Sequence, residues 1–225
     1  ATMRKNLKID VRTGTEVLKI DRVQKFILTR ELSTGTERKE PYDTLVLSPG
    51  AEPVRPPLPG ADSKRVLTLR SIPDMDTIKK IVDNGRLERA VIVGGGYIGL
   101  EMAEALRARK IAVTLVELTG QVMGPVDPEM AAPLHQELSL HGVDLRLGTS
   151  VKGFREETDR LCVDLSTGES VVCGLAILAV GVKPEIKLAK DAGLQTGTRG
   201  GILVDAGMRT SDPSIFAVGD AVDDE

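Results

Sequence analysis

The sequence predicts an α/β fold built around a parallel, Rossmann-like sheet. Short apolar strand segments alternate with amphipathic helical segments between residues 72 and 147. A further apolar run at residues 175–180 is typical of a strand that is buried on both faces. Because strands separated by helices pair in parallel, this β-α-β-α-β order predicts the mononucleotide-binding half of a doubly wound sheet.

The first fifty residues predict an antiparallel meander instead. Alternation of polar and apolar residues marks three expected strands: residues 10–13, 16–21 and 25–30. A turn at residues 33–36 follows, and a short apolar strand at 42–47 ends at Ser48-Pro49-Gly50. Four prolines then occur between residues 53 and 59. Since proline fixes φ and removes an N–H donor, we predict a stiff linker and a domain boundary there.

The elements of the parallel domain follow in order. The expected helices are residues 72–84, 99–109 and a stretch within 127–142, and the expected strands are 90–93, 112–117 and 143–147. Asp127 and Pro128 are typical of an N-cap and a first helical residue. The remaining expected elements are a hairpin of residues 161–165 and 170–173, the buried strand, a helix at 188–192, and strands at 202–204 and 215–220.

Composition excludes several classes of function. The net charge of −3 leaves no basic field for nucleic acid, and the 2% aromatic content without Trp leaves no stacking platform. The longest apolar run is too short to span a bilayer, so we expect no membrane partner. Cys162 and Cys173 lack a CxxC spacing and indicate a reducing compartment. A cytoplasmic location is therefore expected.

The strongest motif is Gly-Gly-Gly-Tyr-Ile-Gly at residues 94–99. It follows a predicted strand and opens a predicted helix, the context that a dinucleotide fingerprint requires. Gly94 permits the tight turn, Gly96 admits a pyrophosphate, and Gly99 allows close packing of helix and strand. The helix N-terminus adds free N–H groups and partial positive charge. The alternative is a glycine-rich turn without a nucleotide.

Glu117, at the end of the next predicted strand, indicates which dinucleotide is bound. A carboxylate can accept two hydrogen bonds from an adenosine ribose and repels a 2′-phosphate. The following Leu118-Thr119-Gly120 supplies no arginine to hold such a phosphate. The sequence therefore predicts that this site binds NAD(H) in preference to NADP(H).

Two further strand ends are candidate ligand sites. Gly181 and Val182 follow the buried strand, and the carboxyl ends of parallel strands bind ligands in such sheets. An ordinary strand exit is the alternative. Near the end of the chain a short apolar strand delivers Asp220 through Gly219. The carboxylate of this aspartate could accept a hydrogen bond from a polyol hydroxyl, or it could serve as a helix N-cap.

These motifs and the segment at residues 42–50 resemble, in order and spacing, the FAD-dependent pyridine nucleotide-disulfide oxidoreductases. Residues 47–53 and 69–74 are most similar to the coenzyme A-disulfide reductase branch, which includes NADH oxidase-like and persulfide reductase-like members. The resemblance implies contacts to FAD from Val17, Ser48, Pro49, Gly50, Gly219 and Asp220. It implies contacts to NAD from Gly94, Gly96, Tyr97, Ile98, Gly99, Glu101, Glu117, Gly181 and Val182.

Some of these implied roles have open alternatives. Ser48-Pro49-Gly50 stands where the family commonly has Ala-Thr-Gly. Tyr97 either covers the flavin until NADH displaces it or is a half-buried aromatic on the helix. Glu101 falls where the family places a carboxylate near nicotinamide and flavin, and no residue of this chain is identified as catalytic. The alternative for Glu101 is a solvated acid in the first helical turn.

The resemblance also implies that the chain is an internal fragment of a homodimeric parent. The sequence lacks an FAD fingerprint and a cysteine that matches the catalytic one, so Cys162 and Cys173 are interpreted as structural. His135 and His141 match no catalytic base. The implied organisation is residues 1–55 as a partial FAD domain, 56–61 as linker, 62–186 as NAD(H) domain and 187–225 as the second FAD piece.

The implied activity of the parent is hydride transfer from NADH to FAD and onward to a small-molecule disulfide, thiol or persulfide. The cysteine for that step would lie outside this chain, which by itself is expected to be inactive and to lack tightly bound FAD. The alternatives are an NADH oxidase or a ferredoxin-type reductase on the same scaffold, or a non-catalytic NAD(H)-sensing module.

Overall fold

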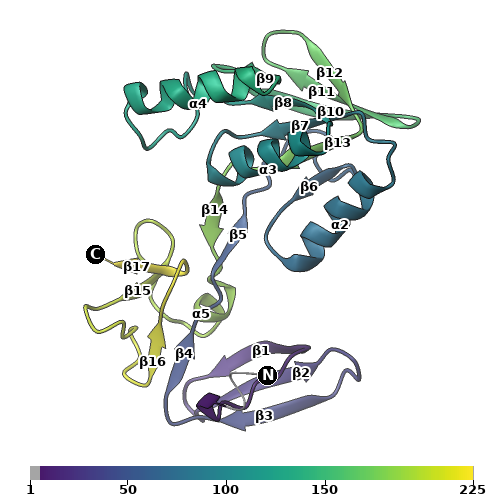
Figure 1. Ribbon diagram of the computed structural model, residues 1–225. Coiled ribbons are helices and arrows are strands. Elements are labelled where there is room, and N and C mark those ends of the chain that lie inside the picture. The colour runs from purple at the N-terminus through teal and green to yellow at the C-terminus, as the bar shows by residue number, and fades with distance from the viewer. Residues whose placement is uncertain (1–5, 225) are drawn as a thin grey trace. The chain divides into compact units, whose positions relative to one another are not determined.

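The computed structural model describes residues 6–224 and divides the chain into two compact units (Figure 1). Unit 1 joins the residues up to Ala51 to those from Lys183 onward, and unit 2 is Glu52–Val182. Residues 183–186, predicted in the NAD(H) domain, therefore group with unit 1. The assignment of the units to FAD and NAD(H) stays a prediction.

The proline-rich segment predicted as a linker belongs to unit 2. Pro59 O accepts a hydrogen bond of 2.8 Å from Phe154 N, and Ala61 is buried. Leu58 packs against the same cluster of buried side chains as Phe154. The prediction that residues 56–61 form a linker between domains was therefore wrong. The segment is extended, but it packs on unit 2 and is part of it.

Unit 2 contains a five-stranded sheet in the order β6-β13-β7-β8-β9, and the five strands are parallel. Its strands are β6 (Val66–Thr68), β7 (Arg89–Val93), β8 (Ala112–Val116), β9 (Val143–Arg146) and β13 (Leu175–Leu178). The helices are α2 (Ile72–Asp83), α3 (Tyr97–Ala108) and α4 (Pro128–Leu140). The predicted β-α-β-α-β order and the α/β class are confirmed. All four residues of β13 are buried, as predicted for a strand covered on both faces.

Side-chain alternation gives the sheet two buried faces. Ile92, Leu115 and Ile177 face a core shared with α2, α3 and α4. Their neighbours Val91 and Leu178 face the opposite way, toward a three-stranded antiparallel sheet. That sheet consists of β10 (Val151–Glu157), β11 (Arg160–Leu165) and β12 (Ser170–Cys173). Unit 2 therefore has three layers: helices, parallel sheet and antiparallel sheet (Figure 1).

The helix ends show how the sequence sets the boundaries. Ser71 and Asp74 form a capping box at the start of α2, in which each residue bonds the backbone N–H of the other. Gly85, with φ of +68°, follows the end of this helix. Asp127 occupies the N-cap position of α4 as predicted, but its side chain makes no capping hydrogen bond.

Unit 1 contains the predicted meander, with strands that differ from those expected. The strands are β1 (Thr15–Asp21), β2 (Phe26–Glu31) and β3 (Glu37–Pro41), paired in that order. Residues 10–13 form no strand, so that prediction was wrong. The sequence Glu-Arg-Lys-Glu-Pro of β3 has no apolar alternation, and only its backbone pairing with β2 makes it a strand.

The rest of unit 1 pairs segments that are far apart in sequence. Strand β4 (Leu45–Leu47) runs parallel to β16 (Ile215–Ala217), and β15 (Ile202–Val204) runs parallel to β17 (Val222–Asp224). Helix α5 of this unit is Lys187–Asp191. Strands β5 (Ala51–Pro53) and β14 (Val182–Pro184) form a two-stranded sheet at the two points where the chain passes from one unit to the other. The core of the unit includes Ile20, Leu47, Ala189, Ile202 and Ile215. Within residues 6–224, no helix is long and apolar enough to cross a membrane.

Candidate functional site

The glycine-rich run connects β7 to α3 in unit 2. Gly94 has φ of +108°, and a Cβ there would overlap the carbonyl oxygen of Ala179, just beyond β13. A Cβ on Gly99 would overlap the carbonyl oxygen of Gly94. Around Gly96, by contrast, no described atom lies within 4 Å of a Cβ position. Gly94 and Gly99 are therefore required for packing, and Gly96 leaves open space into which a ligand can fit.

The N-terminus of α3 is suited to bind an anion. Gly96 is the N-cap residue and provides no side-chain hydrogen bond, and the first turn contains no acidic residue. The partial positive charge of the helix end is therefore not neutralised by a carboxylate of that turn. Glu101 lies beyond the first turn and is exposed, so the interpretation of Glu101 as a first-turn acid was wrong.

Glu117 is half-buried just after β8, and three donors hold its carboxylate. The backbone N–H of Gly95 donates to Oε2 at 2.7 Å. The backbone N–H and the hydroxyl of Thr119 both donate to Oε1, each at 2.8 Å. The carboxylate predicted to contact a ribose is thus joined directly to the glycine-rich loop, a link that the sequence did not reveal.

The segment after Glu117 folds back onto that loop. Met123 N donates to Gly95 O at 2.8 Å, and the side chain of Val122 lies where a Cβ of Gly95 would be. The backbone N–H of Val122 donates to Nε2 of His135 at 3.1 Å. His135 therefore has a structural role as an acceptor from α4, which sequence reasoning did not assign and which no local pattern signals.

Several apolar side chains remain exposed around the carboxyl ends of these strands. Tyr97 is 71% exposed and Leu118 is 69% exposed. The interpretation of Tyr97 as a half-buried aromatic was therefore wrong. Val182 is 54% exposed and follows Gly181, whose φ is +114°. Ile98 is partly buried and its side chain packs against the core.

In unit 1, Ser48, Pro49, Gly50 and Gly219, four of the six predicted FAD-contacting residues, follow two adjacent strand ends. Val218 N donates to Leu47 O at 2.9 Å, which aligns the ends of β16 and β4. A Cβ on Gly219 would lie 3.9 Å from the hydroxyl oxygen of Ser48. The half-buried Pro49 and Gly50 follow Ser48, and Gly50 has φ of +74°.

The other two predicted contacts of unit 1 differ in their surroundings. Asp220 is exposed and lies in a turn that leads into β17 rather than a helix, so the N-cap interpretation was wrong. Val17 is half-buried in β1, on the three-stranded sheet, at a point where the register with β2 shifts.

Both cysteines are free and buried. Burial raises the pKa of the Cys173 thiol to about 11 and also raises the pKa of Cys162. Because the thiolate is the nucleophile, neither side chain is suited to attack a disulfide. Among residues 6–224 no group of three or more His, Cys, Asp or Glu side chains could hold a metal.

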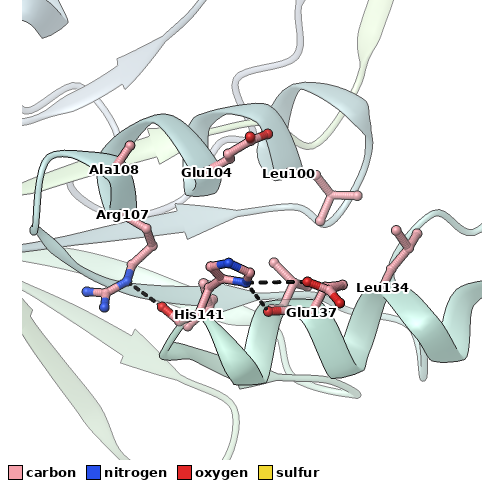
Figure 2. Close-up of a pocket in the computed structure, with 9 residues that line it drawn as sticks. Leu100, Glu104, Arg107, Ala108, Leu134, Glu137 and His141 are labelled. Carbon is pink, nitrogen blue, oxygen red and sulfur yellow. Dashed lines mark hydrogen bonds and ion pairs between the residues drawn. The ribbon is translucent and has the colours of Figure 1, made fainter.

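A groove of about 580 Å³ lies between α3 and α4 (Figure 2). Two of its polar side chains bond to neighbouring main-chain groups. Arg107 donates to the carbonyl oxygens of His141 and Ile111, at 2.7 and 2.9 Å, and His141 Nδ1 lies 2.9 Å from Glu137 O. None of the predicted site residues lines this groove.

Comparison with known proteins places the chain in a family. Residues 2–225 match the family described as pyridine nucleotide-disulphide oxidoreductase. An NADH oxidase from Methanocaldococcus jannaschii is 36% identical over 96% of this chain and 48% of its own length. An NAD(P)H coenzyme A polysulfide/persulfide reductase from Pyrococcus horikoshii is 35% identical over 96% and 47%. The chain thus spans about half the length of these relatives.

Solved structures agree with the sequence relatives. The reduced CoADR-RHD of Bacillus anthracis superposes with a TM-score of 0.94 at 44% identity, over 98% of this chain and 39% of that one. A NAD-dependent persulfide reductase from A. fulgidus gives a TM-score of 0.92 at 37% identity, over 98% and 40%. The chain therefore belongs to the pyridine nucleotide-disulphide oxidoreductase family.

Proposed function

We propose that unit 2 binds NAD(H) at the glycine-rich loop. The observation that carries this proposal is the joint geometry of Gly94, Gly96, Gly99 and Glu117. Two glycines close the turn, the third leaves open space before a helix N-terminus free of acidic side chains, and a fixed carboxylate stands beside it. The helix end would hold the pyrophosphate, and Glu117 would accept from the adenosine ribose.

The same geometry supports a preference for NADH over NADPH. A 2′-phosphate would approach the Glu117 carboxylate, and residues 118–120 contribute no cationic side chain. Exposed Leu118 could cover one face of the adenine, and exposed Val182 could contact the nicotinamide half. Tyr97 and Glu101, both exposed on α3, would face the reacting part of the dinucleotide.

We propose that unit 1 contributes part of an FAD site. The ends of β4 and β16 are aligned, and Ser48 lies beside Gly219. Little else surrounds Gly50 and Gly219, so a cofactor could contact the main chain there closely. Asp220 would accept from ribitol hydroxyls, Gly50 and Pro49 would line the same contact, and Val17 would border the adenine. When bound, FAD supplies the redox centre that accepts a hydride from NADH.

For the whole protein we propose an NADH-dependent flavoprotein oxidoreductase that reduces a small disulfide or persulfide. This proposal is supported by relatives whose names specify coenzyme A-dependent sulfur and persulfide reduction. The nucleophilic thiol would be a cysteine other than Cys162 and Cys173, because both are buried with raised pKa values. A homodimer is proposed as the working form.

A second candidate is an NADH oxidase, favoured by the M. jannaschii relative and by a further one from Enterococcus faecalis that is 31% identical. A ferredoxin as acceptor is the further alternative, supported by a ferredoxin reductase from Rhodopseudomonas palustris with a TM-score of 0.89 at 32% identity. The candidates differ in the acceptor: turnover with coenzyme A disulfide or a persulfide, with oxygen, or with a ferredoxin separates them.

The shared claim is tested on the purified 225-residue chain. NADH is titrated in and nicotinamide fluorescence is recorded, with circular dichroism on the same sample to establish folding. Saturable binding is expected. A folded sample that shows none would overturn the proposed site at Gly94. An absorption spectrum of the same sample is expected to lack a flavin band, since the one GxGxxG-type run of this sequence is that at residues 94–99, which we assign to NAD(H).

A further inference from the structure

Thr119 contacts the Glu117 carboxylate more extensively than any other residue whose bonds to it are described. We propose that Thr119 is a positioning residue: by clamping Glu117 through its hydroxyl, it increases the preference of the site for NADH over NADPH. The inference deepens the proposed function and rests on it, since it assumes that a dinucleotide ribose meets Glu117.

The clamp leaves little freedom to the carboxylate. A carboxylate offers about four acceptor positions, two on each oxygen. Gly95 N–H takes one on Oε2, and the N–H and hydroxyl of Thr119 take both on Oε1. One position, on Oε2, remains for a ligand. The expectation that Glu117 accepts two ribose hydrogen bonds therefore requires one internal donor to be released.

The Thr119 hydroxyl is the donor that can be released. Its oxygen lies 2.8 Å from Glu117 Oε1 and also 2.8 Å from the carbonyl oxygen of Gln121. A hydroxyl has one proton and donates to one acceptor at a time. When a ribose hydroxyl donates to Oε1, the Thr119 hydroxyl can turn to Gln121 O, so NADH binding costs neither group a hydrogen bond.

A 2′-phosphate cannot make this exchange. It carries negative charge and brings acceptors instead of donors, so Glu117 must move away to admit it. That movement breaks all three hydrogen bonds of the clamp. The Thr119 hydroxyl can again turn to Gln121 O, but the carboxylate loses its three donors and the phosphate brings none to replace them. Each donor therefore adds to the cost of binding NADPH, whereas the Thr119 hydroxyl adds little to the cost of binding NADH.

The hydroxyl is also the one donor of the three that belongs to a side chain. Substitution of Thr119 can remove it and leave both backbone donors in place. The main chain of Thr119 is held separately, because its carbonyl oxygen accepts from Gly148 N at 2.8 Å. Since Thr119 is exposed, a substitution there does not open a cavity in the core.

The test measures the Kd of NADH and of NADPH by nicotinamide fluorescence for T119V, for T119S and for the 225-residue chain without substitutions, called the parent chain below. In T119V we expect the Kd of NADPH to fall about fivefold, the value of one modest hydrogen bond, and that of NADH to change less than about twofold. T119S keeps the hydroxyl and should match the parent. T119A removes the same hydroxyl and replaces T119V if that variant does not fold.

A double-mutant cycle with E117Q separates this clamp from a general effect on the loop. Without the anion at residue 117, T119V should no longer change the ratio of the two Kd values. The proposal is overturned if T119V weakens both dinucleotides equally, if the ratio stays at the parent value, or if T119V shifts it equally in the E117Q background.

Failure of the proposed function gives a different result. In that case the parent chain does not bind NADH, or E117Q leaves the ratio of Kd values unchanged although the protein is folded. Either outcome would show that no dinucleotide ribose meets Glu117, which is the assumption on which the role of Thr119 rests. Both measurements are therefore made before the Thr119 variants are compared.

Discussion

The backbone N–H of Gly95 donates to Oε2 of Glu117 at 2.7 Å, and this bond joins the glycine-rich loop to the end of β8. Gly95 is buried, so its N–H has no access to bulk water. The carbonyl oxygen of the same residue accepts a hydrogen bond from Met123 N. The loop that we propose as a pyrophosphate site is thus held in shape by the residue that we propose as the ribose contact.

Replacement of Glu117 by Ala should therefore destabilise the fold as well as the site. E117A leaves the buried Gly95 N–H without its acceptor, and the free energy of unfolding should fall by about 1–3 kcal/mol. Urea denaturation provides the measurement. E104A, at an exposed position of α3, is the matched control and should change stability by less than about 0.5 kcal/mol. Equal effects of the two substitutions would contradict the structural role of the Gly95 bond.

Substitution of Gly99 by Ala tests the close approach of α3 to β7. Alanine is favoured over glycine inside a helix by about 1 kcal/mol. Here the added Cβ overlaps Gly94 O, so we expect the opposite sign: a loss of about 1–3 kcal/mol and at least tenfold weaker NADH binding. The control is G124A, where no described atom lies within 4 Å of the new Cβ. A stabilised G99A variant would show that the loop can move aside.

The pair of Arg155 and Asp164 predicts an acid-dependent contribution to stability. Arg155 donates to both carboxylate oxygens at 2.8 and 2.9 Å and, with Ser170, lowers the pKa of Asp164 to about 2. Because the folded-state pKa is depressed, this stabilisation is present above about pH 4 and is lost as the pH falls toward 2. The pair is partly solvated, so the contribution should be below about 1 kcal/mol.

The measurement is thermal unfolding of the parent chain and of D164N between pH 2 and pH 6. The parent should lose more stability than D164N as the pH falls through this window. Parallel curves would indicate that the ion pair contributes nothing in solution. Arg12 and Asp10 form a more exposed pair, so D10N provides the control and should lower the Tm at pH 6 less than D164N does.

Cys173 predicts a pH dependence of the opposite sign. Burial raises the pKa of its thiol from about 9 to about 11. Stability from the protonated thiol is therefore complete below about pH 9 and is lost as the pH rises toward 11, because the unfolded chain ionises first. Urea denaturation at pH 8 and pH 10.5 should show a smaller loss for C173A than for the parent.

Thiol reactivity provides an independent measure of the same burial. At pH 8, a pKa of about 11 keeps the thiolate fraction roughly a hundredfold below that of an ordinary cysteine. An Ellman titration of the folded chain should therefore be slow and should become fast in urea. Rapid labelling of folded protein would contradict the assignment of Cys173 to the core.

The sequence alone determined the features that depend on local periodicity. Apolar runs and helical spacing located β7, α3, β8, α4 and β13, and the context of Gly94 between a strand and a helix identified the loop. The same periodicity failed at residues 10–13, which alternate without forming a strand, and at β3, which is a strand without alternation. In both cases pairing with a neighbouring strand decides the outcome, and that pairing is not a local property.

The tertiary structure alone decided how the candidate site is assembled. Sheet order places the end of β13 against Gly94, although Ala179 lies far along the chain from it. The clamp on Glu117 by Gly95 and Thr119 depends on side-chain directions at a strand end, and the parallel ends of β4 and β16 depend on long-range pairing. Residue types establish which groups can bind a dinucleotide, whereas long-range packing sets which of their hydrogen-bonding positions remain free.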